Sequence, residues 1–153
     1  MKIKHLEIDG FEDFIELMKG RVFHTTTQES FESIVTDGGL IANISGDRSS
    51  VFGNSNGFFR LRGCISFFDY RELSDARVSE HLYKCVPTRI ADDYKVMVVL
   101  VLSHEAYPDL ESWISWSEEG AYSLKVVPRI EIGYPDFVPL SMISEVLTVS
   151  IIS

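Results

Sequence analysis

Apolar positions along the chain recur with two different spacings, which predicts a domain that mixes helices and strands. In residues 11–19 and 27–37 the apolar side chains return every three or four positions, as is typical of amphipathic helices. Residues 94–102 are almost continuously apolar and rich in valine, which predicts a strand buried on both faces. Because the clearest helices come first and most strands follow, the order favours an α+β fold over a regular alternation of strand and helix.

Shorter segments complete this outline. Further strands are predicted at residues 21–25, 40–44, 63–69, 122–132 and 146–152, and further helices at 73–82, 108–116 and 139–145. Thr26 and Glu29 have capping-box spacing at the start of the second helix, and Gly38 and Gly39 end it. Residues 45–57 are polar and rich in glycine, so we expect a long loop there.

Length, composition and charge limit the classes of protein that fit. A chain of 153 residues with 45% hydrophobic content predicts one domain over residues 1–153. The formal net charge of −9 argues against general coating of nucleic acid, since binding the phosphate backbone needs a cationic surface. No apolar run approaches the ~20 residues that span a bilayer, and the start of the chain lacks a signal-peptide pattern. We therefore expect a cytoplasmic protein that does not associate with membranes.

Several common catalytic and cofactor motifs are absent from the sequence. It contains no Gly-x-Gly-x-x-Gly, no phosphate-binding loop, no His-Glu-x-x-His and no Gly-x-Ser-x-Gly. The four histidines are scattered, and no pair has metal-ligand spacing, so no metal site is predicted. These absences disfavour Rossmann dehydrogenases, P-loop ATPases, zinc peptidases and common serine hydrolases. NAD remains possible as a substrate that is bound in another way.

The densest chemical signal lies in residues 21–40. A predicted strand runs into residues 24–27, which read His-Thr-Thr-Thr, and the capped helix of residues 27–37 follows at once. An imidazole and several hydroxyls are therefore placed at a strand end beside a helix N-terminus, where backbone N–H donors gather. This arrangement is typical of a binding site for a polar ligand.

The same segment resembles the opening of the ADP-ribosyltransferase-like fold. The similarity is closest to the branch that includes poly(ADP-ribose) polymerases and the bacterial toxins that modify DNA, and to abortive-infection proteins of phage resistance. In those proteins a strand ending in His-x-Thr precedes a helix with the pattern Leu/Phe-x-x-Ile-x-x-x-Gly-x-Leu. The matching positions here are His24, Thr26, Phe31, Ile34, Gly38 or Gly39, and Leu40. The resemblance implies a split, mixed or antiparallel sheet with flanking helices, and NAD as the substrate without a metal.

Two later segments extend the resemblance. Residues 63–70 look like the central strand that follows a variable loop, where the family carries a side chain lining the nicotinamide pocket. Ser66 is the candidate within the strand, and Tyr70 is the alternative if the register differs. Residues 128–143 look like the late strand with the catalytic glutamate, and Glu131 holds that position. A carboxylate suits this place because breaking the ribose–nicotinamide bond passes through an oxocarbenium-like state.

The resemblance implies a transferase that moves ADP-ribose from NAD to a macromolecular acceptor, either protein or nucleic acid. A toxin, phage-defence or counter-defence setting would suit such an enzyme. The implied catalytic residues are Glu131 and Ser66, and the implied contacts to NAD are His24, Thr25, Thr26, Tyr70 and Arg60. His24 would bond a ribose hydroxyl or the amide of NAD, and Arg60 its pyrophosphate.

Two alternatives remain open. One is a non-catalytic protein of the same fold that binds a partner as an inhibitor or decoy, with Trp113 and Trp116 as anchors. The other is a relative of RNA 2′-phosphotransferases, which would require Arg48, Arg60 and Arg62 to converge on His24.

Overall fold

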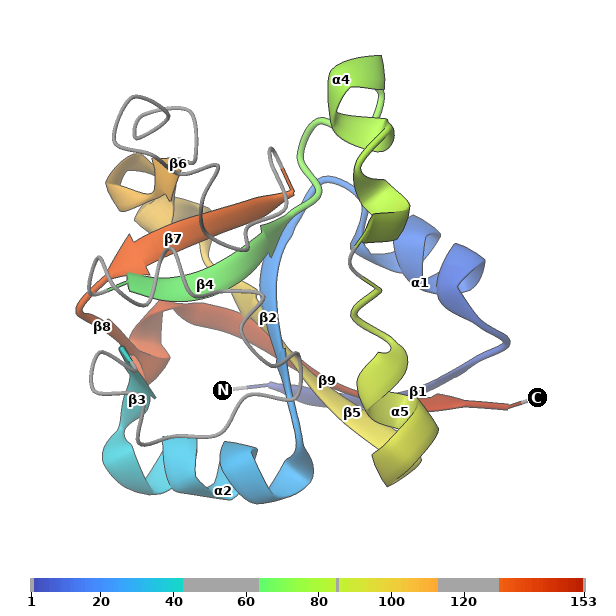
Figure 1. Ribbon diagram of the computed structural model, residues 1–153. Helices are drawn as coiled ribbons and strands as arrows, with labels where there is room; N and C mark the ends of the chain where they lie inside the picture. Colours follow the sequence, from blue (N-terminus) through green and yellow to red (C-terminus); the bar gives the residue numbers. More distant parts are fainter. Residues whose placement is uncertain (1, 43–63, 85, 113–129, 153) are drawn as a thin grey trace.

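A seven-stranded sheet forms the centre of the molecule (Figure 1). The computed structural model describes residues 2–42, 64–84, 86–112 and 130–152. The strands lie in the order β1 (Ile3–Ile8), β9 (Ile143–Ile151), β5 (Val96–Leu102), β2 (Val22–Thr26), β4 (Cys64–Asp69), β7 (Glu131–Pro135) and β6 (Glu111–Ser112). Only the pairing of β1 with β9 is parallel; the other described pairings are antiparallel. The predicted class, a mixed domain with a mostly antiparallel sheet and flanking helices, is thus confirmed.

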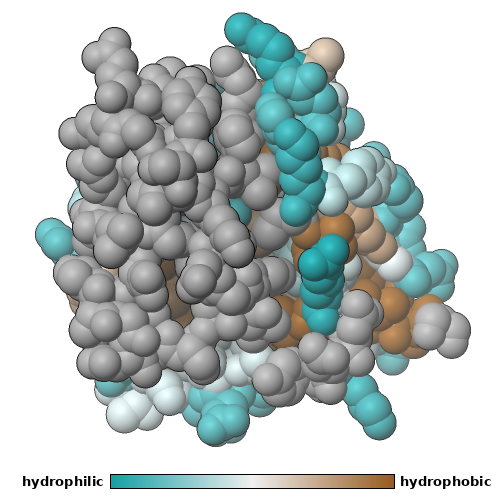
Figure 2. All heavy atoms as spheres, in the orientation of Figure 1, coloured by the Kyte–Doolittle hydropathy of each residue, from teal (hydrophilic) through white to brown (hydrophobic). Residues whose placement is uncertain are grey.

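Helices and short turns cover both faces of this sheet. On one side, the α1 face, Phe23, Phe68 and Val99 pack in one apolar cluster with α1 (Phe11–Met18), α4 (Ala76–Ser79), the 3-10 turn η1 (Leu82–Lys84) and α5 (Arg89–Tyr94). The outer side of α4 carries hydrophilic side chains, and hydrophobic ones show below it (Figure 2). None of the described helices combines the length and apolar character that crossing a membrane would need.

The opposite side of the sheet, the α2 face, holds a second apolar cluster. Val22, Phe67 and Leu100 project to this side. They pack against α2 (Gln28–Asp37), η2 (His104–Asp109) and a two-stranded sheet of β3 (Gly39–Ile41) with β8 (Phe137–Pro139). Phe31 and Ile34 are the buried residues of α2, as the helical spacing predicts. The two clusters bury nearly every side chain of the central strands β5 and β2.

The start of α2 differs by one residue from the predicted cap. Thr27 is the N-cap, and its hydroxyl accepts a hydrogen bond from the backbone N–H of Ser30 at 3.1 Å. Thr26 cannot fill this role because it still belongs to β2, where it is paired with Val98. At the other end Gly38 adopts a left-handed conformation with φ of 81°, which explains the glycine there.

Some predicted elements are wrong. The helix predicted at residues 139–145 is reduced to the 3-10 turn η5 (Leu140–Met142), and Ile143 begins the long strand β9. The helix predicted at residues 108–116 is not present in its described part, because η2 ends at Asp109 and Glu111 pairs with Gly133 in the sheet. The rest of that segment, and most of the strand predicted at residues 122–132, lie outside the described residues.

Candidate functional site

The sheet divides between β2 and β4. These strands pair at Val22 with Asp69 and at Phe23 with Phe68, and their ladder ends there. Beyond that point β2 continues along β5 as far as Thr26, while β4 stays paired with β7. Figure 1 shows the two halves of the sheet diverging from this point. We call the opening the split, and residues predicted to bind NAD lie on both sides of it.

The side chain of His24 bridges the two strands where the ladder stops. Its Nδ1 lies 2.8 Å from the carbonyl oxygen of Ser66. Because a carbonyl can only accept, Nδ1 carries the proton and Nε2 keeps a lone pair. The ring also meets Phe67 edge-on, with centroids 5.7 Å apart. Burial lowers the pKa of His24, and the bond to Ser66 only partly opposes this effect, so the imidazole is neutral near pH 7.

The predicted catalytic residues Glu131 and Ser66 lie on the same face of the sheet. Glu131 is directly opposite Phe68, and Ser66 is directly opposite Gly133. Since Phe68 belongs to the α1 face, alternation along the strands places Glu131 and Ser66 on that face too. Diagonal neighbours of this kind lie roughly 7–8 Å apart. The carboxyl side chain of Glu131 is buried, with only 4% of its surface exposed.

Thr25 and Tyr70 also lie on the α1 face. Thr25 is paired with Val99 and is 6% exposed, and its hydroxyl has no hydrogen-bond partner within the described segments. A buried hydroxyl of this kind is costly unless water or a ligand satisfies it. Tyr70 is fully buried, and its ring meets that of Phe23 with centroids 4.8 Å apart. Thr25 is therefore better placed than Tyr70 to meet a ligand.

The remaining predicted contacts to NAD are separated from this group. Thr26 and His24 share the α2 face with Phe67, since they alternate with Thr25 along β2. The single hydrogen bond of His24 to the described residues goes to Ser66, so no such bond joins it to Glu131. Arg60 lies outside the described residues, as do Arg48, Arg62, Trp113 and Trp116.

A contact between Cys64 and Glu111 adds chemistry that was not predicted. The thiol of Cys64 donates to a carboxylate oxygen of Glu111 at 3.1 Å. These residues belong to β4 and β6, with β7 between them, and Glu111 is directly opposite Gly133. The contact therefore crosses β7 on the α1 face, where Gly133 has no side chain to obstruct it. Cys64 precedes Ser66 by two positions, but Glu111 is 47 residues away along the chain and was predicted to be helical.

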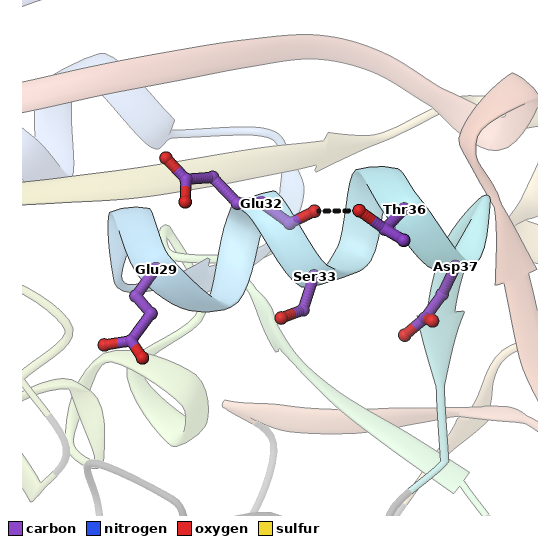
Figure 3. Close-up of a pocket in the computed structure, with 5 residues that line it drawn as sticks. All are labelled: Glu29, Glu32, Ser33, Thr36 and Asp37. Carbon is purple, nitrogen blue, oxygen red and sulfur yellow. Dashed lines mark hydrogen bonds between the residues drawn. The ribbon is translucent and has the colours of Figure 1, made fainter.

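A shallow depression of about 400 Å³ lies on the exposed side of α2. Glu29, Glu32, Ser33, Thr36 and Asp37 line it. Figure 3 shows Glu29, Ser33 and Asp37 extending from one side of the helix, and Glu32 from the other. The hydroxyl of Thr36 bonds the backbone carbonyl of Glu32 at 3.0 Å. So many carboxylates disfavour a phosphate ligand here and favour a cationic one.

Comparisons with known proteins identify no relative: neither a protein-family model nor a curated protein matches this chain. In the part of the chain that the structure describes, no group of three or more His, Cys, Asp or Glu residues could hold a metal ion. Function must therefore be inferred from the sequence motifs and from the geometry around the split.

Proposed function

We propose that this protein is an ADP-ribosyltransferase-like enzyme that transfers ADP-ribose from NAD to a macromolecular acceptor. The observation that carries the proposal is the burial of Glu131, which is 4% exposed and shares a face with Ser66. Burying a carboxyl group costs free energy, and residues that carry such a cost are concentrated at functional sites. Glu131 is also the residue to which the motif resemblance assigns the catalytic role.

The proposed role of Glu131 is to stabilise the positive charge that develops on the ribose when NAD is cleaved. When the bond between ribose C1′ and nicotinamide breaks, nicotinamide leaves with the electron pair and positive charge develops at C1′. A carboxylate held in a site that excludes water stabilises that charge more strongly than it could in solution. Ser66 lies diagonally from Glu131 across the β4–β7 ladder, so its hydroxyl can orient the nicotinamide group.

The state of His24 defines which part of NAD it can contact. A neutral imidazole with a lone pair on Nε2 accepts a hydrogen bond from a ribose hydroxyl or from the carboxamide. It does not supply the positive charge that a pyrophosphate requires, and Arg60 is proposed for that role. The unsatisfied hydroxyl of Thr25 supports a polar ligand in the split. We accordingly propose that the divergence of β2 and β4 is the split of an ADP-ribosyltransferase-like sheet.

Replacing Glu131 by glutamine tests this proposal. The change keeps the shape of the side chain but removes its charge, so we expect the variant to fold and still to be stabilised by NAD. Nicotinamide release should fall at least about 100-fold, as is usual when an electrostatic transition-state contact is lost. Glu29→Gln is the matched control, since Glu29 is an exposed carboxylate on α2. The proposal fails if NAD neither raises the melting temperature of the wild-type protein nor releases nicotinamide with any acceptor.

The acidic side of α2 favours a second candidate, a non-catalytic protein that binds a basic partner. Glu29, Glu32 and Asp37 line the depression shown in Figure 3. Under this alternative the wild-type protein would bind a cationic peptide in a salt-dependent manner and would not respond to NAD. Changing the three acids to their amides should then abolish peptide binding, whereas Glu131→Gln should leave it unchanged.

A further inference from the structure

We infer that a surface on the two-stranded sheet of β3 and β8 docks a basic polypeptide that presents an apolar side chain. We call this surface the outer face; it is formed by Gly39, Ile41, Phe137 and Pro139. It belongs to a different sheet from the one that contains the split. The inference therefore does not rest on the proposed function, and it applies equally if the protein does not cleave NAD.

The pairing of β3 with β8 separates their side chains into an inner set and an outer set. Leu40 is directly opposite Val138, and both are buried in the apolar cluster of the α2 face. Because side chains alternate along a strand, the pairs on either side of these two residues project the opposite way and form the outer face. A sheet face in contact with water usually carries polar side chains, but no residue of the outer face has one.

Ile41 and Phe137 provide the apolar surface of the outer face. They are directly opposite each other in the ladder, and 43% and 39% of their respective surfaces are exposed. The ring of Phe137 lies against the backbone of Gly39, since a Cβ at Gly39 would be 2.7 Å from the ring atom Cζ. This packing holds the ring in place before a partner arrives. An aromatic side chain that is already ordered loses little conformational entropy on binding, which suits it to anchor a partner.

The charged residues in the segments that build this surface are all acidic. Residues 25–42 and 130–144, which include α2, β3, β8 and η5, contain no lysine, arginine or histidine. Their exposed acids are Glu29, Glu32, Asp37 and Asp136. Asp136 directly precedes Phe137, and the depression on α2 reaches Asp37, just before β3 begins (Figure 3). A cationic polypeptide complements this charge, whereas nucleic acid or an anionic membrane would be repelled.

A second copy of this chain fits the outer face poorly. A two-fold contact through this face would bring the acids of one copy close to the same acids of the other, and each chain has a formal net charge of −9. Two side chains that are less than half exposed also supply far less than the ~800 Å² per partner that a stable dimer buries. An apolar anchor of this size, helped by attraction between opposite charges, suits a transient complex with a basic partner.

Binding of synthetic peptides, measured by fluorescence anisotropy without NAD, tests the inference. One probe is a short lysine-rich peptide with a central leucine, and the other has serine in place of that leucine. We expect the wild-type protein to bind the leucine peptide about tenfold more tightly, a usual effect for an anchor residue. Phe137→Ser should remove this preference, and Phe137→Leu should keep most of it. Ile152→Ser is the matched control, because Ile152 is 51% exposed and close to the C-terminus, which lies across the molecule from β3 (Figure 1).

Several results would overturn the inference without affecting the proposed function. The wild-type protein could bind neither peptide, bind both equally, or bind a glutamate-rich peptide as well as the lysine-rich one. A folded Phe137→Ser variant could keep the wild-type preference; if this variant does not fold, Ile41→Ser replaces it and the same loss is expected. Sedimentation could also reveal a dimer that Phe137→Ser abolishes, which would mean that a second copy occupies the outer face.

Discussion

Replacing His24 by phenylalanine should destabilise the fold at the point where the sheet divides. The aromatic ring and its contact with Phe67 can be kept, but the Nδ1–H donor that lies 2.8 Å from the Ser66 carbonyl is lost. No strand hydrogen bond replaces it, because the β2–β4 ladder has already ended at Phe23 and Phe68. Leaving a buried acceptor without a partner costs about 1–3 kcal/mol. For a domain of this size each kcal/mol lowers the melting temperature by about 2–4 °C, so we expect a decrease of roughly 2–12 °C.

The effect should also depend on pH, because burial lowers the pKa of His24 in the folded protein below its ordinary value of 6.5. Between the folded and unfolded pKa values the unfolded chain binds more protons, so acid favours unfolding. The contribution of the neutral imidazole is therefore complete above pH 6.5 and is lost as the pH falls through that value toward the folded pKa. The phenylalanine variant lacks this ionisation, so its deficit relative to the wild type should shrink in acid.

Urea denaturation at several pH values measures both effects. Ser66→Ala is the matched control, because it removes the side chain of Ser66 but keeps the carbonyl that His24 bonds. We expect a small change in the midpoint for this control and a larger one for the His24 variant. Equal stability of the His24 variant and the wild type at neutral pH, or a deficit that does not vary with pH, would refute the structural role given to His24.

Two further changes probe the fold at other places. Gly39→Ala should lower the melting temperature sharply, because a Cβ there would lie 2.2 Å from the carbonyl oxygen of Val138. An unchanged melting temperature would show that β3 and β8 are not packed as described. Glu145→Gln removes a carboxylate whose pKa is lowered in the folded protein. Burial raises this pKa, but the hydrogen bonds from Lys4 and Arg21 outweigh the effect of burial. The contribution of this carboxylate is at most about 1 kcal/mol because its partners Lys4 and Arg21 are exposed, with 44% and 39% of their side chains accessible. This contribution should be present above pH 4.5 and disappear in stronger acid; a urea midpoint difference that persists in acid contradicts it.

The spacing of apolar residues within a short segment predicted the helices and strands whose burial is visible in that segment alone. The helix α2, with Phe31 and Ile34 on its inner side, and the buried strand β5 follow directly from their spacing. β1 was not predicted, because it is an edge strand whose residues, such as Ile3, are largely exposed and whose partner β9 is far away in the sequence. Strand pairing over such distances leaves no local pattern.

The same distinction applies to the candidate site. The motifs pointed to Glu131 and Ser66, but only the register of β4 with β7 shows that both lie on the α1 face. Conversely, His24 and Thr25 are adjacent in the sequence and were both predicted to contact NAD, but their side chains lie on opposite faces of the sheet. Glu111 could not be predicted at all, because its relation to Cys64 exists only once β6 pairs with β7.

The central claim is that NAD binds in the split, and a crystal structure of the Glu131→Gln variant with NAD tests it most directly. We expect the dinucleotide between β2 and β4, with the nicotinamide ribose within hydrogen-bond reach of residue 131 and a hydroxyl or the carboxamide donating to Nε2 of His24. A structure at saturating NAD in which the split holds no dinucleotide, or in which NAD binds elsewhere, would contradict the account.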